Sequence, residues 1–270
     1  MQRLEDELER ARSLDVDDLA DAIETVGFEC TRCGACCKGH EPENAGDAAA
    51  NADADGSGER EPHTATVFPD EVRRVRDGLN ERAETDDAVA SPASATTGEG
   101  EEEDADADSN AEDRQPYDWR DVARPTPFGL REGPDGPTGE TFEWALAVDD
   151  CGDCAFYDEA GDEGTCTAYG DRPLVCRTYP FSVALGGVDE PMGEVVDGEG
   201  MVRAHECEGL GRDISREDAE ALAATLKERA VREIEEAIAV RESYAPVETD
   251  ERVVVHDSEG AKRPDGSPLD

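Results

Sequence analysis

The apolar residues near the start of the chain follow helical spacing. Leu4 and Leu8 stand four positions apart in a charged stretch that ends near Ser13. A second run places five apolar residues on one helical face: Val16, Leu19, Ala20, Ile23 and Val26. We therefore expect two consecutive helices, the second of them amphipathic and leading directly into Phe28.

A third helical pattern begins at Pro69, a residue that suits the first turn of a helix. The acidic Asp70 and Glu71 that follow suit the positive end of the helix dipole. Apolar residues then recur at Val72, Val75 and Leu79, so we expect one buried face.

Later segments show the alternation of a strand in some places and helical spacing in others. Residues 141–148 (TFEWALAV) alternate well enough for a strand in a short antiparallel pair. Ser215 and Asp218 resemble a capping box, and a long helix should run from there to about Tyr244. Its inward candidates are Leu222, Leu226, Ile234 and Ile238. Residues 253–256 (VVVH) suggest a last short strand, and we expect a loose tail after Asp257.

Two acidic stretches lack any apolar period. Residues 41–60 are rich in Asp, Asn, Ala and Gly, and 81–114 carry one basic residue, Arg82, among many carboxylates before Arg114 at their end. Such composition buries too little apolar surface to offset ordering entropy, so we interpret both stretches as disordered insertions. We therefore expect one small, helix-rich α+β domain over residues 1–245, stapled by metal and containing short antiparallel strands. A C-terminal strand and tail over 246–270 complete the chain.

The net charge of the chain indicates the salt concentration at which the protein works. The 270 residues have a formal net charge of -44, and only three of the basic residues are lysines: Lys38, Lys227 and Lys262. An excess of carboxylates with few lysines is typical of a halophilic protein. In molar salt the Debye length is only about 3 Å, so carboxylates hardly repel one another. Ordinary acidic disordered segments would also raise the charge.

The same charge disfavours nucleic acid and anionic membrane partners, since both need a basic face. The N-terminus has no apolar signal core, and no apolar run is long enough to span a bilayer. We therefore expect a cytoplasmic location. The protein partner stays open.

Nine cysteines carry the candidate chemistry. Four lie within eight residues in CTRCGACC, from Cys30 to Cys37, and the others are Cys151, Cys154, Cys166, Cys176 and Cys207. In a reducing compartment, paired cysteine motifs favour metal over disulfides. The adjacent Cys36 and Cys37 would bind one small ion only with strain, so we expect one on each of two metals or irons. A vicinal disulfide is geometrically poor.

Other residue types near the thiols add candidates. The cations Arg32, Lys38, Arg172 and Arg177 lie within or beside the cysteine motifs and could compensate thiolate charge. His40 and His205 are possible additional ligands, although a surface histidine is commoner. Four residues could cover a metal or simply pack in the core: Tyr169, Tyr179, Pro180 and Phe181.

The segments FECxxCGxCC (28–37), CAFY (154–157) and CTAYGDRPLVCRTYPF (166–181) resemble the YkgJ-type cysteine-cluster family. That family has a CxxCxxCC signature and is described as zinc- or iron-chelating. The resemblance covers roughly residues 14–80 and 115–245, and Cys207 matches a late Cys-x-Gly element. It implies eight metal ligands: Cys30, Cys33, Cys36, Cys37, Cys154, Cys166, Cys176 and Cys207. Cys151 departs from the pattern and leaves the ligand count in question.

Three functions fit these residues. The first is a zinc- or iron-binding module whose metal staples the fold. The second is an iron–sulfur redox protein, or an enzyme like the flagellin lysine methylases, which share related cysteine patterns. Both remain open because zinc and iron–sulfur clusters each accept four thiolates. The third, metal storage or delivery, would leave thiols partly exposed. The chain contains no phosphate loop, dinucleotide fingerprint or serine-nucleophile elbow, so an enzymatic role is undecided.

Overall fold

The computed structural model describes residues 3–40, 60–90, 115–159, 164–185, 195–197 and 200–269, with only the backbone for 86–90. Its helices are α1 (Leu4–Ser13), α2 (Val16–Val26), α4 (Pro69–Ala90), α5 (Trp119–Val122), α6 (Leu174–Thr178) and α7 (Arg216–Ser243). Short 3-10 turns follow at η1 (Ala35–Cys37) and η3 (Tyr169–Asp171). The chain is an α+β protein, as its sequence predicts.

The strands are short and form several small sheets. One sheet has the order β1 (Thr66–Val67), β5 (Trp144–Leu146), β2 (Ala123–Pro125), and a second has the order β8 (Phe181–Val183), β10 (Val202–His205), β9 (Val195–Asp197). A third runs β12 (Gly260–Lys262), β11 (Val253–Asp257), β4 (Thr138–Thr141), β3 (Leu130–Arg131). The hairpin β6 (Tyr157–Asp158) and β7 (Thr165–Cys166) stands alone. The described strand pairs are antiparallel except β4 with β11.

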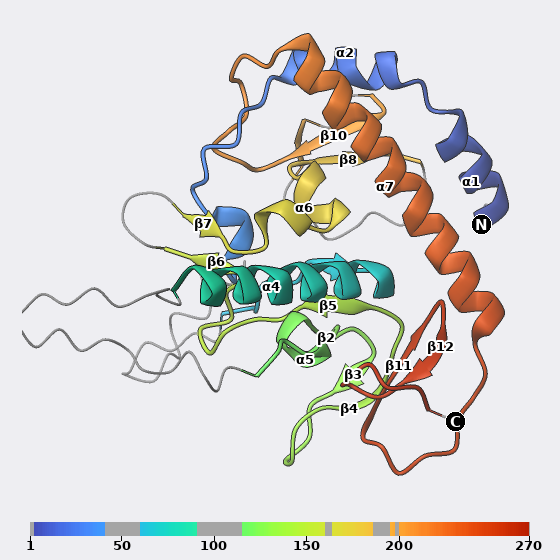
Figure 1. Cartoon of the computed structure of the whole chain (residues 1–270). Helices are drawn as coiled ribbons and strands as arrows, with labels where there is room; N and C mark the ends of the chain where they lie inside the picture. Colours follow the sequence, from blue (N-terminus) through green and yellow to red (C-terminus); the bar gives the residue numbers. More distant parts are fainter. Residues whose placement is uncertain are drawn as a thin grey trace, which may run out of the picture.

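The long helix α7 ties the molecule together. Figure 1 shows it running from α2 and α1 at the top down to β11 and β12 at the bottom, while α4 crosses the middle. Ser215 caps its start by accepting a hydrogen bond from the amide of Asp218, as the sequence predicts. Of the predicted inward residues, Leu226 and Ile234 are buried, and Leu222 and Ile238 are half-buried. Buried Arg229 reaches across to the hydroxyl of Thr178, linking α7 to α6.

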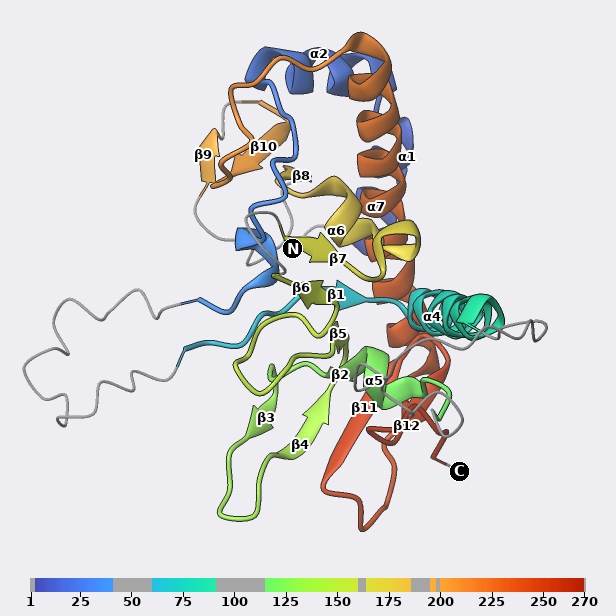
Figure 2. The same ribbon diagram turned by 60° about the vertical axis from the view of Figure 1, so that its left-hand side comes forward.

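Two hydrophobic clusters make up the core. The first cluster lies around α4, α5 and β5 and includes Val72, Val75, Trp119, Trp144 and Leu146. The second cluster joins α1, α2, α7, β8 and β10 and includes Leu19, Ile23, Phe181, Ala204 and Leu226. The predicted apolar faces of α2 and α4 thus pack in different clusters. Figure 2 shows η1, α6 and the β6–β7 hairpin in the region between them.

The helix beginning at Pro69 is longer than expected. It continues to Ala90, ten residues into the stretch from Glu81 that we interpreted as disordered. Arg82, within this extension, pairs with Asp171 of η3, and its guanidinium lies 2.6 Å from that carboxylate. Because Glu, Arg and Ala have high helix propensity, the helix extends beyond its last apolar residue. Residues 41–59 and 91–114 of the predicted insertions lie outside the described residues.

The C-terminal tail is ordered, which corrects the expectation of a loose end after Asp257. The β11–β12 hairpin adds to β4, and Lys262 is buried with its ammonium 2.8 Å from the Asp257 carboxylate. The indole of Trp144 donates to the same carboxylate at 2.8 Å. Two opposite charges are buried at low cost only when they pair and are hydrogen-bonded in this way. The composition of the tail cannot show that Lys262 and Asp257 meet.

The segment predicted as one strand over 141–148 is divided. Thr141 ends β4, and Trp144 starts β5, which pairs antiparallel with β1 and β2. The predicted strand at 253–256 is confirmed as β11. In the part of the chain that is described, no helix is both long and apolar enough to cross a bilayer.

Candidate metal centre

The first cysteine loop is held by a glycine turn against the β6–β7 hairpin. Gly34 has a φ of +74° and precedes η1, which carries Cys36 and Cys37. A side chain at Gly34 would collide with the ring of Tyr157, the first residue of β6. The carbonyl of Arg32 accepts a 3.0 Å hydrogen bond from the amide of Gly164. The tight turn expected from Gly34 is therefore present, and it also allows close approach of the hairpin.

Three later thiols lie on the core side of this loop. Cys154 precedes β6, Cys166 ends β7, and Cys176 lies within α6. We call these three the inner thiols, because Cys154 is only 5% exposed and the other two pack against the first cluster. The amide of Cys154 donates a 2.7 Å hydrogen bond to the carbonyl of Cys37, which itself packs against that cluster.

Three further thiols lie at the other end of the loop, and we call Cys30, Cys33 and Cys207 the outer thiols. Phe28 forms a β-bridge with Leu210, and the amide of Glu29 donates a 3.0 Å hydrogen bond to the carbonyl of Gly209. This pairing joins the segment before Cys30 to the segment after Cys207. The loop from Cys30 to Cys37 therefore contacts the late segment at its start and the inner thiols at its end.

Backbone amides donate hydrogen bonds to three of the sulfurs. The amide of Gly209 lies 3.4 Å from the sulfur of Cys207. The amides of Phe156 and Ala168 bond the sulfurs of Cys154 and Cys166 in the same i+2 arrangement, and each bond lowers the pKa of its thiol. Hydrogen bonds to sulfur stabilise the thiolate form that metals require. These turns therefore suit ligand thiolates.

The inner thiols influence one another. Burial raises the pKa of Cys154, and with the charge on Cys166 and Cys36 it reaches about 11. Burial also raises the pKa of Cys176 well above its usual value, and Cys154, Cys36 and Cys166 contribute to that rise. Neighbouring thiols that oppose each other's ionisation need a cation to become thiolates together.

Among the outer thiols, Cys207 is affected by its neighbours in the same way. Burial raises the pKa of Cys207, and charge on Cys33, Cys36 and Cys30 raises it further. Cys36 therefore acts on both groups. A hydrogen bond with Cys37 and burial raise the pKa of Cys36 itself, and the two sulfurs lie 4.0 Å apart. The vicinal pair thus stands between the inner and outer thiols.

The donor set fits a thiolate-bound metal in its chemistry. All nine cysteines are free thiols, so no disulfide competes with metal binding, and a Cys36–Cys37 disulfide is absent. Within the described ranges, no three His, Cys, Asp or Glu side chains form a geometry that could hold an ion as they stand. Binding would therefore require the sulfurs to close in further.

The four cations near the thiols have different partners. Lys38 is paired with Glu159 at 2.8 Å, so its charge is already compensated. Arg172 stacks on the ring of Tyr169 at 3.9 Å and has no carboxylate partner among the described residues. Its charge lowers the pKa of the Cys36, Cys166 and Cys176 thiols.

Arg32 and Arg177 are more peripheral. Arg32 is exposed and lies 5.7 Å from the Tyr169 ring, and Arg177 is exposed on α6. The Tyr169 ring is 53% exposed, so it forms a stacking surface for arginines rather than an apolar cover. Phe181 is fully buried, but it packs in the second cluster, edge-on to Phe28. The expected cover over a metal is therefore not formed by these two rings.

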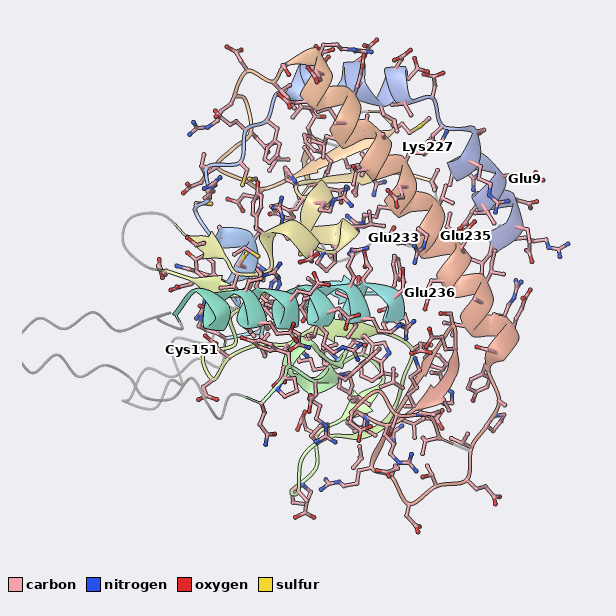
Figure 3. All side chains as sticks on the ribbon, viewed as in Figure 1. Glu9, Cys151, Lys227, Glu233, Glu235 and Glu236 are labelled. Carbon is pink, nitrogen blue, oxygen red and sulfur yellow. The ribbon has the colours of Figure 1, made fainter. Side chains whose placement is uncertain are left out.

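The histidine candidates lie in separate surroundings. His40 is exposed and bridges to Glu61 after the first cysteine loop. His205 is buried on β10, and its Nε2 lies 2.8 Å from the hydroxyl of Ser182. Cys151 is exposed on the turn before Cys154, and Figure 3 shows it at the margin of the described structure.

The contact that Glu71 makes with α6 could not be predicted from the sequence. Glu71, only 2% exposed, accepts a 2.9 Å hydrogen bond from the amide of Leu174 at the start of α6. It also pairs with Arg74 of its own helix at 3.1 Å. Its carboxylate thus positions the helix that carries Cys176. The sequence marked Glu71 only as a helix-start residue, because its partner lies far along the chain.

Comparison with known proteins agrees with this thiol arrangement. Residues 29–208 match the CxxCxxCC family, described as a "Putative zinc- or iron-chelating domain". The match begins just before Cys30 and ends just after Cys207, so it contains all nine cysteines. No curated protein and no solved structure matches the chain.

Proposed function

The chain belongs to the CxxCxxCC family, and we propose that it binds two zinc or iron centres through eight cysteines. The ligands would be the inner thiols, the outer thiols and the vicinal pair: Cys154, Cys166 and Cys176; Cys30, Cys33 and Cys207; Cys36 and Cys37. Each group of three would take one member of the vicinal pair. Four thiolates satisfy a tetrahedral zinc site or an iron–sulfur cluster.

One observation carries this proposal: the loop from Cys30 to Cys37 contacts the inner thiols at its end, through the Cys154–Cys37 hydrogen bond, and the segment after Cys207 at its start. Neighbouring cysteines, Cys36 among them, raise the pKa of Cys154, Cys176 and Cys207, and thiols this close can share a cation. The amide bonds to Cys154, Cys166 and Cys207 support it, because they favour the thiolate form.

The bound metal would join segments that are far apart in the sequence. Cys30 to Cys37 precede α4, whereas the inner thiols follow β5 and Cys207 follows β10. Structural zinc contributes roughly 10–16 kcal/mol of apparent binding free energy in small domains. That is enough to hold the first cysteine loop between the β6–β7 hairpin and the late segment.

Metal analysis of natively purified protein tests the proposal. We expect two equivalents of zinc in a colourless protein, or iron with sulfide and visible absorption if the centres are clusters. The eight-cysteine assignment is checked by replacing each cysteine with serine and measuring bound metal. A wild-type protein that holds no metal under anaerobic purification and reconstitution would refute the proposal.

A further inference from the structure

The two groups of thiols differ in access to solvent. Cys154 is buried, and the half-buried Cys166 and Cys176 pack against the first cluster beside Val175 and Tyr157. Among the outer thiols, Cys30 is exposed, and Cys33 and Cys207 are half-buried. Structural metal sites are closed by protein, whereas sites that react or exchange keep a position open.

An open hollow of about 310 Å³ lies directly beside Cys30. Phe28 on one side and Ile214 and Leu222 on the other give it an apolar lining. Both walls are fixed, because Phe28 is bridged to Leu210 and Leu222 belongs to α7. The hollow therefore lies between the start of the cysteine loop and the first turns of α7.

The charged residues of the hollow are all acidic. Glu29, Asp213 and Asp218 contribute to its lining, and no lysine or arginine does. Arg212 lies 3.9 Å from Glu29 and offsets its charge, so Asp213 and Asp218 supply the remaining negative charge of the lining. An anion entering the hollow would be repelled, whereas a neutral or cationic group would not.

We infer that the outer thiols form an exchangeable metal site, in which a neutral nitrogen donor that enters the hollow can replace the exposed Cys30 thiolate as a ligand. The inner thiols form the closed site that stabilises the fold. This inference rests on the proposed metal binding and adds a division of roles between its two centres. The relevant ligand class is an amine or imidazole, small enough to sit against Phe28 and Leu222.

Metal release tests the division of roles. Zinc-loaded protein mixed with excess chromogenic chelator should lose one equivalent rapidly and the second at least about tenfold more slowly. The Cys30→Ser variant should lose the fast equivalent and retain the slow one. Release of both ions at one rate would overturn the inference and leave the proposed metal binding intact. A wild-type protein without zinc would instead refute the proposed function.

Access through the hollow is tested with cobalt-loaded protein and two probes, imidazole and azide. Imidazole should change the visible cobalt spectrum at lower concentration than the anionic azide does. Leu222→Trp, which fills the hollow, should abolish the imidazole response. Ala224→Trp places the same ring at an exposed position of α7 and should not. Equal responses to both probes, or an unchanged response in Leu222→Trp, would contradict entry through this hollow.

Discussion

The amide of Cys154 donates a 2.7 Å hydrogen bond to the carbonyl of Cys37, so the two cysteine motifs are joined through their backbones. This contact brings the inner thiols to the end of the first cysteine loop without any metal. Cys151, three residues earlier, lies on an exposed turn and its amide donates a hydrogen bond to Asp149.

The first prediction separates Cys154 from Cys151. Cys154→Ser should remove one metal equivalent and lower the midpoint of thermal unfolding, because the inner centre joins the loop to the core. Cys151→Ser should keep both the metal content and the midpoint of the wild type. Metal analysis and calorimetry on both variants give the answer, and loss of metal in Cys151→Ser would show that this thiol is a ligand.

The second prediction concerns Arg172. Its charge lowers the pKa of three thiols and has no carboxylate partner among the described residues. Arg172→Gln should therefore weaken metal binding by about tenfold, within the range known for groups that surround metal ligands. The pH at half-saturation should rise, because the thiols then ionise less readily.

Competition with a chelator across a pH series measures both effects of Arg172. Arg172→Lys retains the charge and should recover part of the affinity. Arg177→Gln, at an exposed neighbouring position, is the matched control and should behave as wild type. Equal affinities in Arg172→Gln and wild type would exclude charge compensation by this residue.

The third prediction is a pH dependence of stability from His63. Burial lowers the pKa of His63 to about 4 from its usual 6.5, and nearby His40 and Arg124 contribute. The unfolded chain therefore takes up a proton at a pH where the native protein does not. Stability from this group is complete above pH 6.5 and falls by about 3 kcal/mol as the pH drops toward 4.

Denaturant unfolding of wild type and His63→Gln at several pH values checks this sign. The difference between the two proteins should vary between about pH 6.5 and 4 and be constant outside that window. His40→Gln removes one of the groups that lower the pKa of His63 and should narrow this window at its acidic end. A constant difference across the whole range would rule out titration of His63 as the cause.

The fourth prediction tests the buried C-terminal pair. Lys262→Met leaves the Asp257 carboxylate buried without its ammonium and should lower the free energy of unfolding by about 3–5 kcal/mol. Adding Asp257→Asn should recover part of the loss, since the amide oxygen can still accept from Trp144. Chemical denaturation measures both variants. A loss below that of Arg120→Gln, which removes a surface pair with Asp265, would contradict a stabilising role.

The fifth prediction concerns salt. Carboxylates crowd the surface, and Arg216 alone lies within ion-pair distance of Asp17, Asp21, Glu24 and Glu220. We propose that the protein is halophilic and that its fold loosens at low salt. Screening is weaker there, so repulsion between carboxylates acts over a longer distance. Far-UV circular dichroism in molar salt and in about 50 mM salt tests this. Identical spectra would contradict the proposal.

The sequence by itself determined the local elements. Apolar spacing located α2, α4 and α7, and the cap at Ser215 located the start of α7, because these signals depend only on neighbours in the chain. Cysteine spacing likewise identified the thiol motifs and the family. Local pattern could not show where α4 ends, because residues 81–90 have helical propensity without an apolar face.

The tertiary structure decided which distant groups meet. It brought Glu71 to the start of α6, buried Lys262 against Asp257, and stacked Arg172 on the ring of Tyr169. It also buried Cys154 in the core and left Cys30 exposed beside an open hollow. Burial and pairing depend on which surfaces pack together, and the spacing of cysteines along a chain carries no record of that.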